Sequence, residues 1–362
     1  MNVTVLTGPG LVADPDLVEK LAGREFRALG VHGRVAAAGS VPALGRLIGA
    51  ADAGALVVLP GPDPEARRLM TLHGPHTPRT VWLDLHRTGP LPVAGGAAHL
   101  HGRGLWGLTW AVRHAVHRLR RPARRIPYGL HPDQWGELRL PGGMGERVPP
   151  VTVLIHGGNW RSPWGADTMD ALCVDLADRG FAAWNLEYRR PDVHGWAATT
   201  SDVRAGLAAL DRFPAQLQRV DLRRVVVLGH SAGGQLALRV AAEAPETVTL
   251  AVSLAGVFDL AEQDRRHYGN GAVRDALGGG HAELPGLYAA ADPLARLPLG
   301  VPQVVVQGAD DEPDLVDAGR RYARAAGREA VYLEGPGDHF DVIDPASHLW
   351  LDTAEQIVKS LG

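Results

Sequence analysis

The chain has 362 residues, which exceeds one average domain and favours two. Hydrophobic residues make up 45% and charged residues 21%, which is typical of a packed protein and excludes a mainly disordered chain. A formal net charge of −3 provides no overall basic surface for nucleic acid, and the single cysteine, Cys173, excludes an intramolecular disulfide. No apolar run reaches about 18 residues, so we expect no membrane helix, no secretory signal and a cytoplasmic location.

The first 120 residues alternate between strand and helix patterns. Apolar runs predict strands at 3–6, 55–59 and 80–83, and helical spacing predicts helices at 16–29, 41–48 and 105–119. Strands that alternate with helices form a parallel sheet covered on both faces. We therefore predict an α/β domain over residues 1–120.

A cluster of arginines follows this first domain. Residues 118–125 contain five arginines and Pro122. The cluster is short and has no interleaved aromatic residues, so it does not have the pattern of a nucleic-acid site. We predict a solvated helix end that continues into a linker at 121–127.

Residues 128–362 repeat the alternation on a larger scale. Strands are predicted at 151–155, 181–186, 224–228, 248–254, 302–307 and 330–333, and helices at 169–179, 202–213, 235–242, 315–326 and 349–361. This pattern predicts a second α/β domain with its own parallel sheet.

The strongest motif in this second part is G-x-S-x-G at 229–233. It lies between a predicted strand and a predicted helix, which is the context of a nucleophile elbow. Glycines are expected on both sides of Ser231 because the turn is tight. The serine then lies at a helix N-terminus, where free N–H groups favour a nearby anion.

A glycine-rich loop, 156–160, follows the strand at 151–155. Backbone N–H groups in such a loop can stabilise the oxyanion of a tetrahedral intermediate. We expect Gly158 and Asn159 to supply one side of this oxyanion hole and Ala232 the other. His156 is expected to brace the loop. Trp160 and His230 are candidates for the substrate pocket, although simple packing explains Trp160 equally well.

The acid and the histidine of such a site should follow the serine in sequence. Asp310 and Asp311 come after the strand at 302–307, and Asp311 is preferred because it lies three residues beyond Gly308. His339 follows the strand at 330–333, whereas His348 lies near the final helix. The sequence thus predicts Ser231, Asp311 and His339 as the catalytic residues.

With these motifs, residues 126–362 resemble the α/β-hydrolase superfamily, and most closely its esterase and kynurenine-formamidase-like branch. The matching segments are 156–160, 185–190, 229–234, 308–311 and 338–340, and Gln307 departs from the histidine usual before the glycine. The resemblance implies a serine hydrolase that cleaves a small-molecule ester through an acyl-enzyme, with no metal and no cofactor. An arylformamidase that cleaves N-formyl-kynurenine and a non-catalytic binding or scaffold protein are the alternatives. The segment 256–302 is expected to cap the site.

Residues 1–120 resemble type II 3-dehydroquinate dehydratase, which implies a flavodoxin-like fold. The similar segments are 3–11, 55–61 and 102–107. The dehydratase needs a tyrosine, and none precedes Tyr128. Gly10 and Leu59 stand where the family has asparagines, and Asp84 stands where it has a histidine. We therefore expect a domain that has lost its chemistry and that mediates homo-oligomer assembly or shapes the hydrolase entrance.

Overall fold

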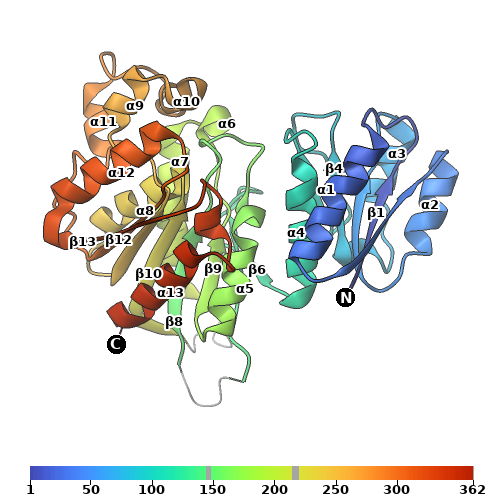
Figure 1. Cartoon of the computed structure of the whole chain (residues 1–362), viewed down its shortest axis with the longest axis horizontal. Helices are drawn as coiled ribbons and strands as arrows, with labels where there is room; N and C mark the ends of the chain where they lie inside the picture. Colours follow the sequence, from blue (N-terminus) through green and yellow to red (C-terminus); the bar gives the residue numbers. More distant parts are fainter. Residues whose placement is uncertain (144–147, 214–219, 362) are drawn as a thin grey trace. The chain divides into compact units, whose positions relative to one another are not determined.

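The computed structural model describes residues 1–143, 148–213 and 220–361. The chain divides into two compact units, Met1–Pro122 and Ala123–Gly362 (Figure 1). Within the described ranges, no helix is both long and apolar enough to cross a membrane.

The first unit is built on a five-stranded sheet in which all neighbouring strands are parallel. Its strands are β1 (Asn2–Thr7), β2 (His32–Ala37), β3 (Ala55–Leu59), β4 (Thr80–Asp84) and β5 (Ala98–His101). Its helices are α1 (Pro15–Ala28), α2 (Val41–Gly49), α3 (Pro64–Arg68) and α4 (Gly107–Arg120), with short 3₁₀ turns η1 (Leu69–Thr71) and η2 (Thr77–Arg79). The strand order β2-β1-β3-β4-β5 is the flavodoxin-like order, which confirms the predicted fold.

Two strands of this sheet, β2 and β5, were not predicted from the sequence. Both lie at an edge of the sheet. β2 is largely exposed and contains Gly33, and β5 carries two histidines in four residues. Edge strands need little apolar surface, so neither has the apolar run that identifies the fully buried β3 and β4.

The second unit contains an eight-stranded sheet in the order β13-β12-β11-β10-β8-β9-β7-β6. Its strands are β6 (Arg124–Pro127), β7 (Trp135–Arg139), β8 (Pro150–Ile155), β9 (Ala182–Leu186), β10 (Asp221–His230), β11 (Leu250–Leu254), β12 (Gln303–Gly308) and β13 (Ala330–Gly335). The pairs β6–β7 and β7–β9 are antiparallel, and the others are parallel. The carboxyl ends of the six parallel strands therefore share one edge.

Helices cover this sheet. The α-helices are α5 (Asp170–Asp178), α6 (Pro191–His194), α7 (Trp196–Ala208), α8 (Ala232–Glu243), α9 (Leu260–Arg265), α10 (Tyr268–Leu277), α11 (Pro285–Ala291), α12 (Pro313–Ala326) and α13 (His348–Leu361). The 3₁₀ turns are η3 (Ala166–Met169), η4 (Ala209–Arg212), η6 (Gly327–Glu329) and η7 (Asp341–Ile343). Figure 1 shows α9, α10 and α11 gathered at one end of this unit, and all three come from the segment expected to cap the site.

The linker predicted at 121–127 is shorter in the structure. Its last four residues form β6, which pairs with β7. The Arg125 guanidinium lies 3.6 Å from the ring centroid of Trp135 and donates to Glu137 at 2.9 Å. An arginine cluster that looks like solvated linker therefore supplies an edge strand, because its side chains cover the neighbouring strand.

Candidate active site

Ser231 lies at a tight turn between β10 and α8. Its backbone has φ 55° and ψ −122°, a region that residues with side chains rarely adopt. A Cβ on Gly229 would lie 2.0 Å from the Gly233 carbonyl oxygen, and one on Gly233 would lie 2.2 Å from the Ile155 oxygen. Only glycine fits on either side of the serine, as the motif predicts.

Asp311 and His339 meet beside the same edge of the sheet. Nδ1 of His339 lies 2.8 Å from Oδ2 of Asp311, which also accepts from Gln307 Nε2 at 2.8 Å. Burial alone would raise the pKa of Asp311, but the hydrogen bond and charge of His339, with bonds from the Glu312 N–H and Gln307, lower that pKa below its usual value. Asp311 therefore stays ionised opposite the imidazole.

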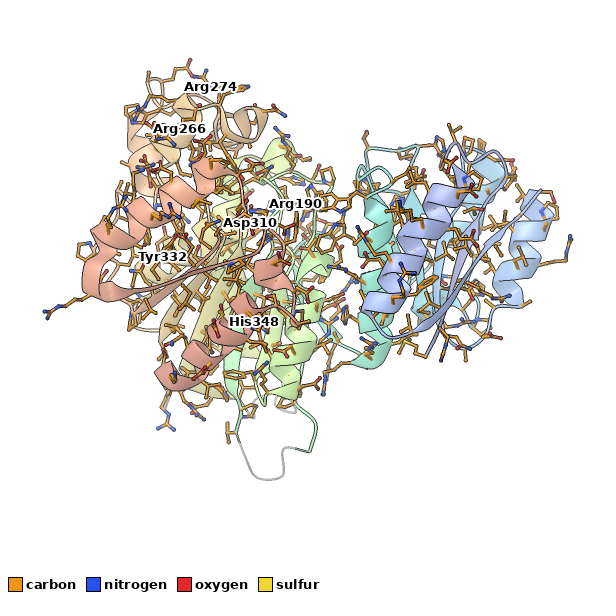
Figure 2. All side chains as sticks on the ribbon, viewed as in Figure 1. Arg190, Arg266, Arg274, Asp310, Tyr332 and His348 are labelled. Atoms are coloured by element: carbon orange, nitrogen blue, oxygen red, sulfur yellow. The ribbon has the colours of Figure 1, made fainter. Side chains whose placement is uncertain are left out.

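The neighbouring carboxylate, Asp310, has a different role. Its Oδ2 accepts the backbone N–H of Gly337 at 3.0 Å, so it ties the two strand-end loops together (Figure 2). The structure thus brings Asp311, the preferred candidate, to His339 and leaves the fallback candidate as a loop brace.

The glycine-rich loop packs directly on the serine turn. A Cβ on Gly157 would lie 2.6 Å from the His230 carbonyl oxygen and 2.8 Å from Cβ of Ser231. The next three residues have positive φ: 108° at Gly158, 53° at Asn159 and 55° at Trp160. Two segments more than 60 residues apart in sequence are thereby brought together.

A buried polar network supports this loop. His156 has no exposed surface, and its Nε2 lies 3.2 Å from Oε1 of Glu187 while Nδ1 lies 2.8 Å from the Gly157 oxygen. Its ring stacks on Tyr188, whose hydroxyl donates back to the His156 carbonyl at 2.7 Å. Burial would raise the pKa of Glu187, but Arg190 and His156 lower it to about 2. His156 braces the loop, as the sequence suggested.

Both side chains expected at a substrate pocket, Trp160 and His230, are buried and hydrogen-bonded within the protein. Trp160 is 1% exposed, and its ring N–H donates to Gln235 at 3.2 Å, so it packs beneath the loop. His230 is 3% exposed, and its Nε2 donates to the backbone oxygen of His339 at 2.9 Å. Burial and the neighbouring His339 lower the pKa of His230 to about 3, so it stays neutral. His230 thus holds the main chain of the catalytic-histidine candidate.

The sequence did not identify Tyr268, which α10 brings to the serine. Burial and the charges of Glu312 and Asp311 raise the pKa of this buried tyrosine, whereas a hydrogen bond with Ser231 lowers it. The backbone around it is unusual, because His267 and Asn270 both have positive φ. Arg161 donates to the Gly269 carbonyl at 3.2 Å and connects this turn to the glycine-rich loop.

The polar residues at the strand ends of the first unit are arranged differently. Asp84, at the end of β4, accepts two hydrogen bonds from Arg67, at 2.6 and 3.1 Å, and one from the His86 N–H. A pocket of about 420 Å³ lies between the loop after β1 and the end of β2. The resemblance of this unit to dehydroquinate dehydratase, and its loss of chemistry, stay predictions.

Comparisons with known proteins agree with the sheet and the motifs. The model of the BD-FAE family matches residues 137–316. Esterase LipC of Mycobacterium tuberculosis (strain ATCC 25618 / H37Rv) is 28% identical over 265 residues, which cover 65% of this chain and 63% of the esterase. The chain thus matches less than two thirds of that relative's length.

Two solved structures share the fold at low identity. A bacterial heroin esterase is 23% identical with a TM-score of 0.55, over 66% of this chain and 84% of that one. Esterase B from Lactobacillus Rhamnosis (HN001) is 20% identical with a TM-score of 0.56, over 71% of this chain and 91% of that one.

Proposed function

We propose that this chain, whose second unit is similar to α/β-hydrolase esterases, hydrolyses carboxylic esters of small molecules through a covalent acyl-enzyme. The observation that carries the proposal is the 2.8 Å contact between His339 Nδ1 and Asp311, next to a serine on a strained turn. The names of the relatives, which are esterases, favour an ester over a formamide.

In the proposed reaction Ser231 is the nucleophile. Because Nδ1 of His339 donates to Asp311, the lone pair of Nε2 is free to accept the serine hydroxyl proton as Oγ attacks the substrate carbonyl. Asp311 orients the imidazole and stabilises its charged form. When the tetrahedral intermediate collapses, the C–O bond to the alcohol breaks and His339 returns the proton to the leaving oxygen.

The negative oxygen of the intermediate needs hydrogen-bond donors. The backbone N–H of Ala232, at the start of α8, supports one side, where the helix dipole also favours negative charge. Gly158 and Asn159 support the other side, since their loop packs on the serine turn. Water then attacks the acyl-enzyme, with His339 as base, and releases the acid. Every step uses side chains and backbone of this chain, without a metal or an organic cofactor.

A serine-directed probe tests the proposal. A fluorophosphonate should label the wild-type chain and a Ser201→Ala control, in which an exposed serine on α7 is removed, but not Ser231→Ala. We expect Ser231→Ala to lower kcat for p-nitrophenyl acetate by about 10⁴- to 10⁶-fold while the circular dichroism spectrum is unchanged. Wild-type protein that is neither labelled nor active would instead indicate the binding or scaffold role.

The same assay separates the two hydrolase candidates. Faster turnover of N-formyl-kynurenine than of p-nitrophenyl esters would replace the ester assignment with an arylformamidase, with the same nucleophile. Size measurement of the purified chain at several concentrations tests the homo-oligomer expected from the first unit.

A further inference from the structure

Three side chains with metal-binding chemistry meet on the second unit, outside the proposed active site. His131 and Asp133 lie on the loop between β6 and β7, and His194 is the last residue of α6. Oδ2 of Asp133 lies 4.0 Å from Nδ1 of His131 and 4.0 Å from Nε2 of His194. One candidate ligand atom from each side chain lies within 4.8 Å of the other two. These three residues are called the His-Asp-His cluster below.

The three groups are those of a transition-metal site. Imidazole nitrogen and carboxylate oxygen together suit zinc and similar divalent ions, whereas calcium and magnesium prefer oxygen ligands alone. Three protein ligands with water in a fourth position are a common zinc arrangement. With bonds of about 2.0–2.2 Å, neighbouring ligand atoms of a tetrahedral site lie roughly 3.4 Å apart, so the cluster closes with small side-chain rotations. We propose that the His-Asp-His cluster binds one zinc-like divalent ion.

The backbone positions of the ligands are already held in place. Oε1 of Gln134 accepts the His131 backbone N–H at 3.0 Å, and its Nε2 donates to Asp202 at 2.6 Å. The Tyr128 hydroxyl donates to the Glu187 carbonyl at 2.6 Å and fixes the start of the same loop. The two imidazoles already face each other edge to face, with centroids 4.7 Å apart. A preorganised cluster needs little ordering when the ion arrives.

Two existing interactions compete with the ion. The backbone N–H of Asp133 donates to Nδ1 of His131 at 3.1 Å, and an ion on that nitrogen takes over its lone pair. Arg190 lies 3.6 Å from the Asp133 carboxylate and repels a cation. However, Arg190 also pairs with Glu187 and retains that partner when Asp133 turns to the ion. The side chains of the cluster are about one third exposed or less, so the ion has access from solvent.

No sequence motif indicates this site, and the motifs that are present led to an expectation of no metal. His131 and Asp133 are two residues apart, but His194 follows only after the strands β7, β8 and β9 and the helix α5. No short metal motif spans that distance, and the chain has 16 histidines. Only the fold brings the end of α6 and the β6–β7 loop together.

The test uses the full-length chain after chelator treatment, with Zn²⁺ added in calorimetry and Co²⁺ in absorption spectroscopy. We expect one tight Zn²⁺ per chain, visible cobalt bands of a tetrahedral site and a rise in Tm with zinc. Asp133→Asn and His194→Ala should each weaken zinc binding by at least tenfold and remove the cobalt bands. His348→Ala, which removes an exposed histidine at the start of α13, should bind as wild type does (Figure 2).

Two results would overturn the proposal. One is zinc binding by Asp133→Asn and His194→Ala with wild-type affinity, because the ion would then be on other histidines. The other is equal stabilisation by calcium and zinc without cobalt bands, which would indicate non-specific cation binding. Circular dichroism of the metal-free variants shows whether either variant has lost its fold. If His194→Ala is unfolded, zinc binding by Asp133→Asn, which keeps the side-chain shape, tests the proposal. None of these measurements depends on ester hydrolysis.

Discussion

Each unit has a buried aspartate at the carboxyl end of a parallel strand, and the two aspartates have different partners. Asp84 ends β4 of the first unit and is 1% exposed; Asp311 follows β12 of the second and is 8% exposed. Asp84 is held by two hydrogen bonds from the Arg67 guanidinium, whereas Asp311 faces the His339 imidazole. The carboxyl ends of parallel strands in the two sheets thus carry the same residue type for different purposes.

The partner decides what each carboxylate can do. A guanidinium does not release its proton in proteins, so the pair of Asp84 and Arg67 is permanently charged and fastens α3 to the sheet. An imidazole gains and loses a proton near neutral pH, so Asp311 can stabilise a charge that appears only during a reaction. A buried aspartate at a strand end therefore indicates function only when its partner can exchange protons.

The largest expected effect in this comparison is that of Asp311→Asn. The amide still contacts His339, but it favours the wrong imidazole tautomer and cannot stabilise the imidazolium. We expect kcat for ester hydrolysis to fall by about 10⁴-fold, as measured with p-nitrophenyl acetate at neutral pH. Asp310→Asn is the matched control, since the Asp310 carboxylate accepts the Gly337 N–H and not a histidine, and it should retain activity within about threefold. If Asp310→Asn lowered kcat more than Asp311→Asn, Asp310 would be the catalytic acid instead.

The second expected effect is on stability alone. Asp84→Asn removes the charge opposite Arg67, and we expect the first unit to lose about 2 kcal/mol at pH 7. Hydrogen exchange of the β4 amides, with urea unfolding, measures this loss. Ester hydrolysis at 25 °C should stay within about twofold of wild type, because the proposed mechanism uses no residue of the first unit. If Asp84→Asn lowered kcat as much as Asp311→Asn does, the proposed difference in role between the two aspartates would be wrong.

The pKa of Asp84 sets how the stability difference between wild type and Asp84→Asn depends on pH. Burial would raise that pKa, but Arg67 and the His86 N–H lower it below its ordinary value of 3.8. A carboxylate with a lowered folded-state pKa stabilises the fold fully above the unfolded-state value and loses that contribution as the pH falls through the folded-state value. The stability difference between wild type and Asp84→Asn should therefore shrink below about pH 3.8. A difference that stays constant into acid would mean that Asp84 acts by shape rather than charge.

The features that sequence predicted best are local. The serine turn, the glycine-rich loop and the loop of His339 each consist of a few consecutive residues after an apolar strand, so their identity is set within one segment. The α/β architecture of both units was predicted for the same reason, because buried parallel strands are continuous apolar runs.

The features that sequence did not predict depend on contacts between distant segments. Tyr268 reaches Ser231 only through the path of the cap helices, and nothing in its own segment indicates that contact. Glu187 supports the glycine-rich loop from the end of another strand. The sequence left pocket and packing equally open for Trp160, and the structure buries its side chain on a loop residue with positive φ. Such roles follow from tertiary packing, and periodicity carries no information about them.

The smallest expected effect concerns Gln307, which replaces the histidine expected from the resemblance. Its buried Nε2 donates to the same Asp311 oxygen that faces His339. This one oxygen therefore accepts hydrogen bonds from both the Gln307 amide and the His339 imidazole. Gln307→Leu keeps a similar volume but removes a hydrogen bond to a charged group, and the pKa of Asp311 should rise. We expect kcat for p-nitrophenyl acetate to fall by about tenfold, equivalent to ~1.4 kcal/mol, with little change in KM.

Gln307→His distinguishes the donor from the volume that it fills. An imidazole N–H at this position can still donate to Asp311, so we expect activity within about threefold of wild type. If both variants lose activity equally, the packing of Gln307 matters and its amide does not. If neither loses activity, the Glu312 N–H, which donates to the other carboxylate oxygen at 2.7 Å, is sufficient to hold Asp311. In that case Asp84 would be held mainly by the Arg67 side chain, whereas the backbone N–H of Glu312 would be enough to hold Asp311 in place.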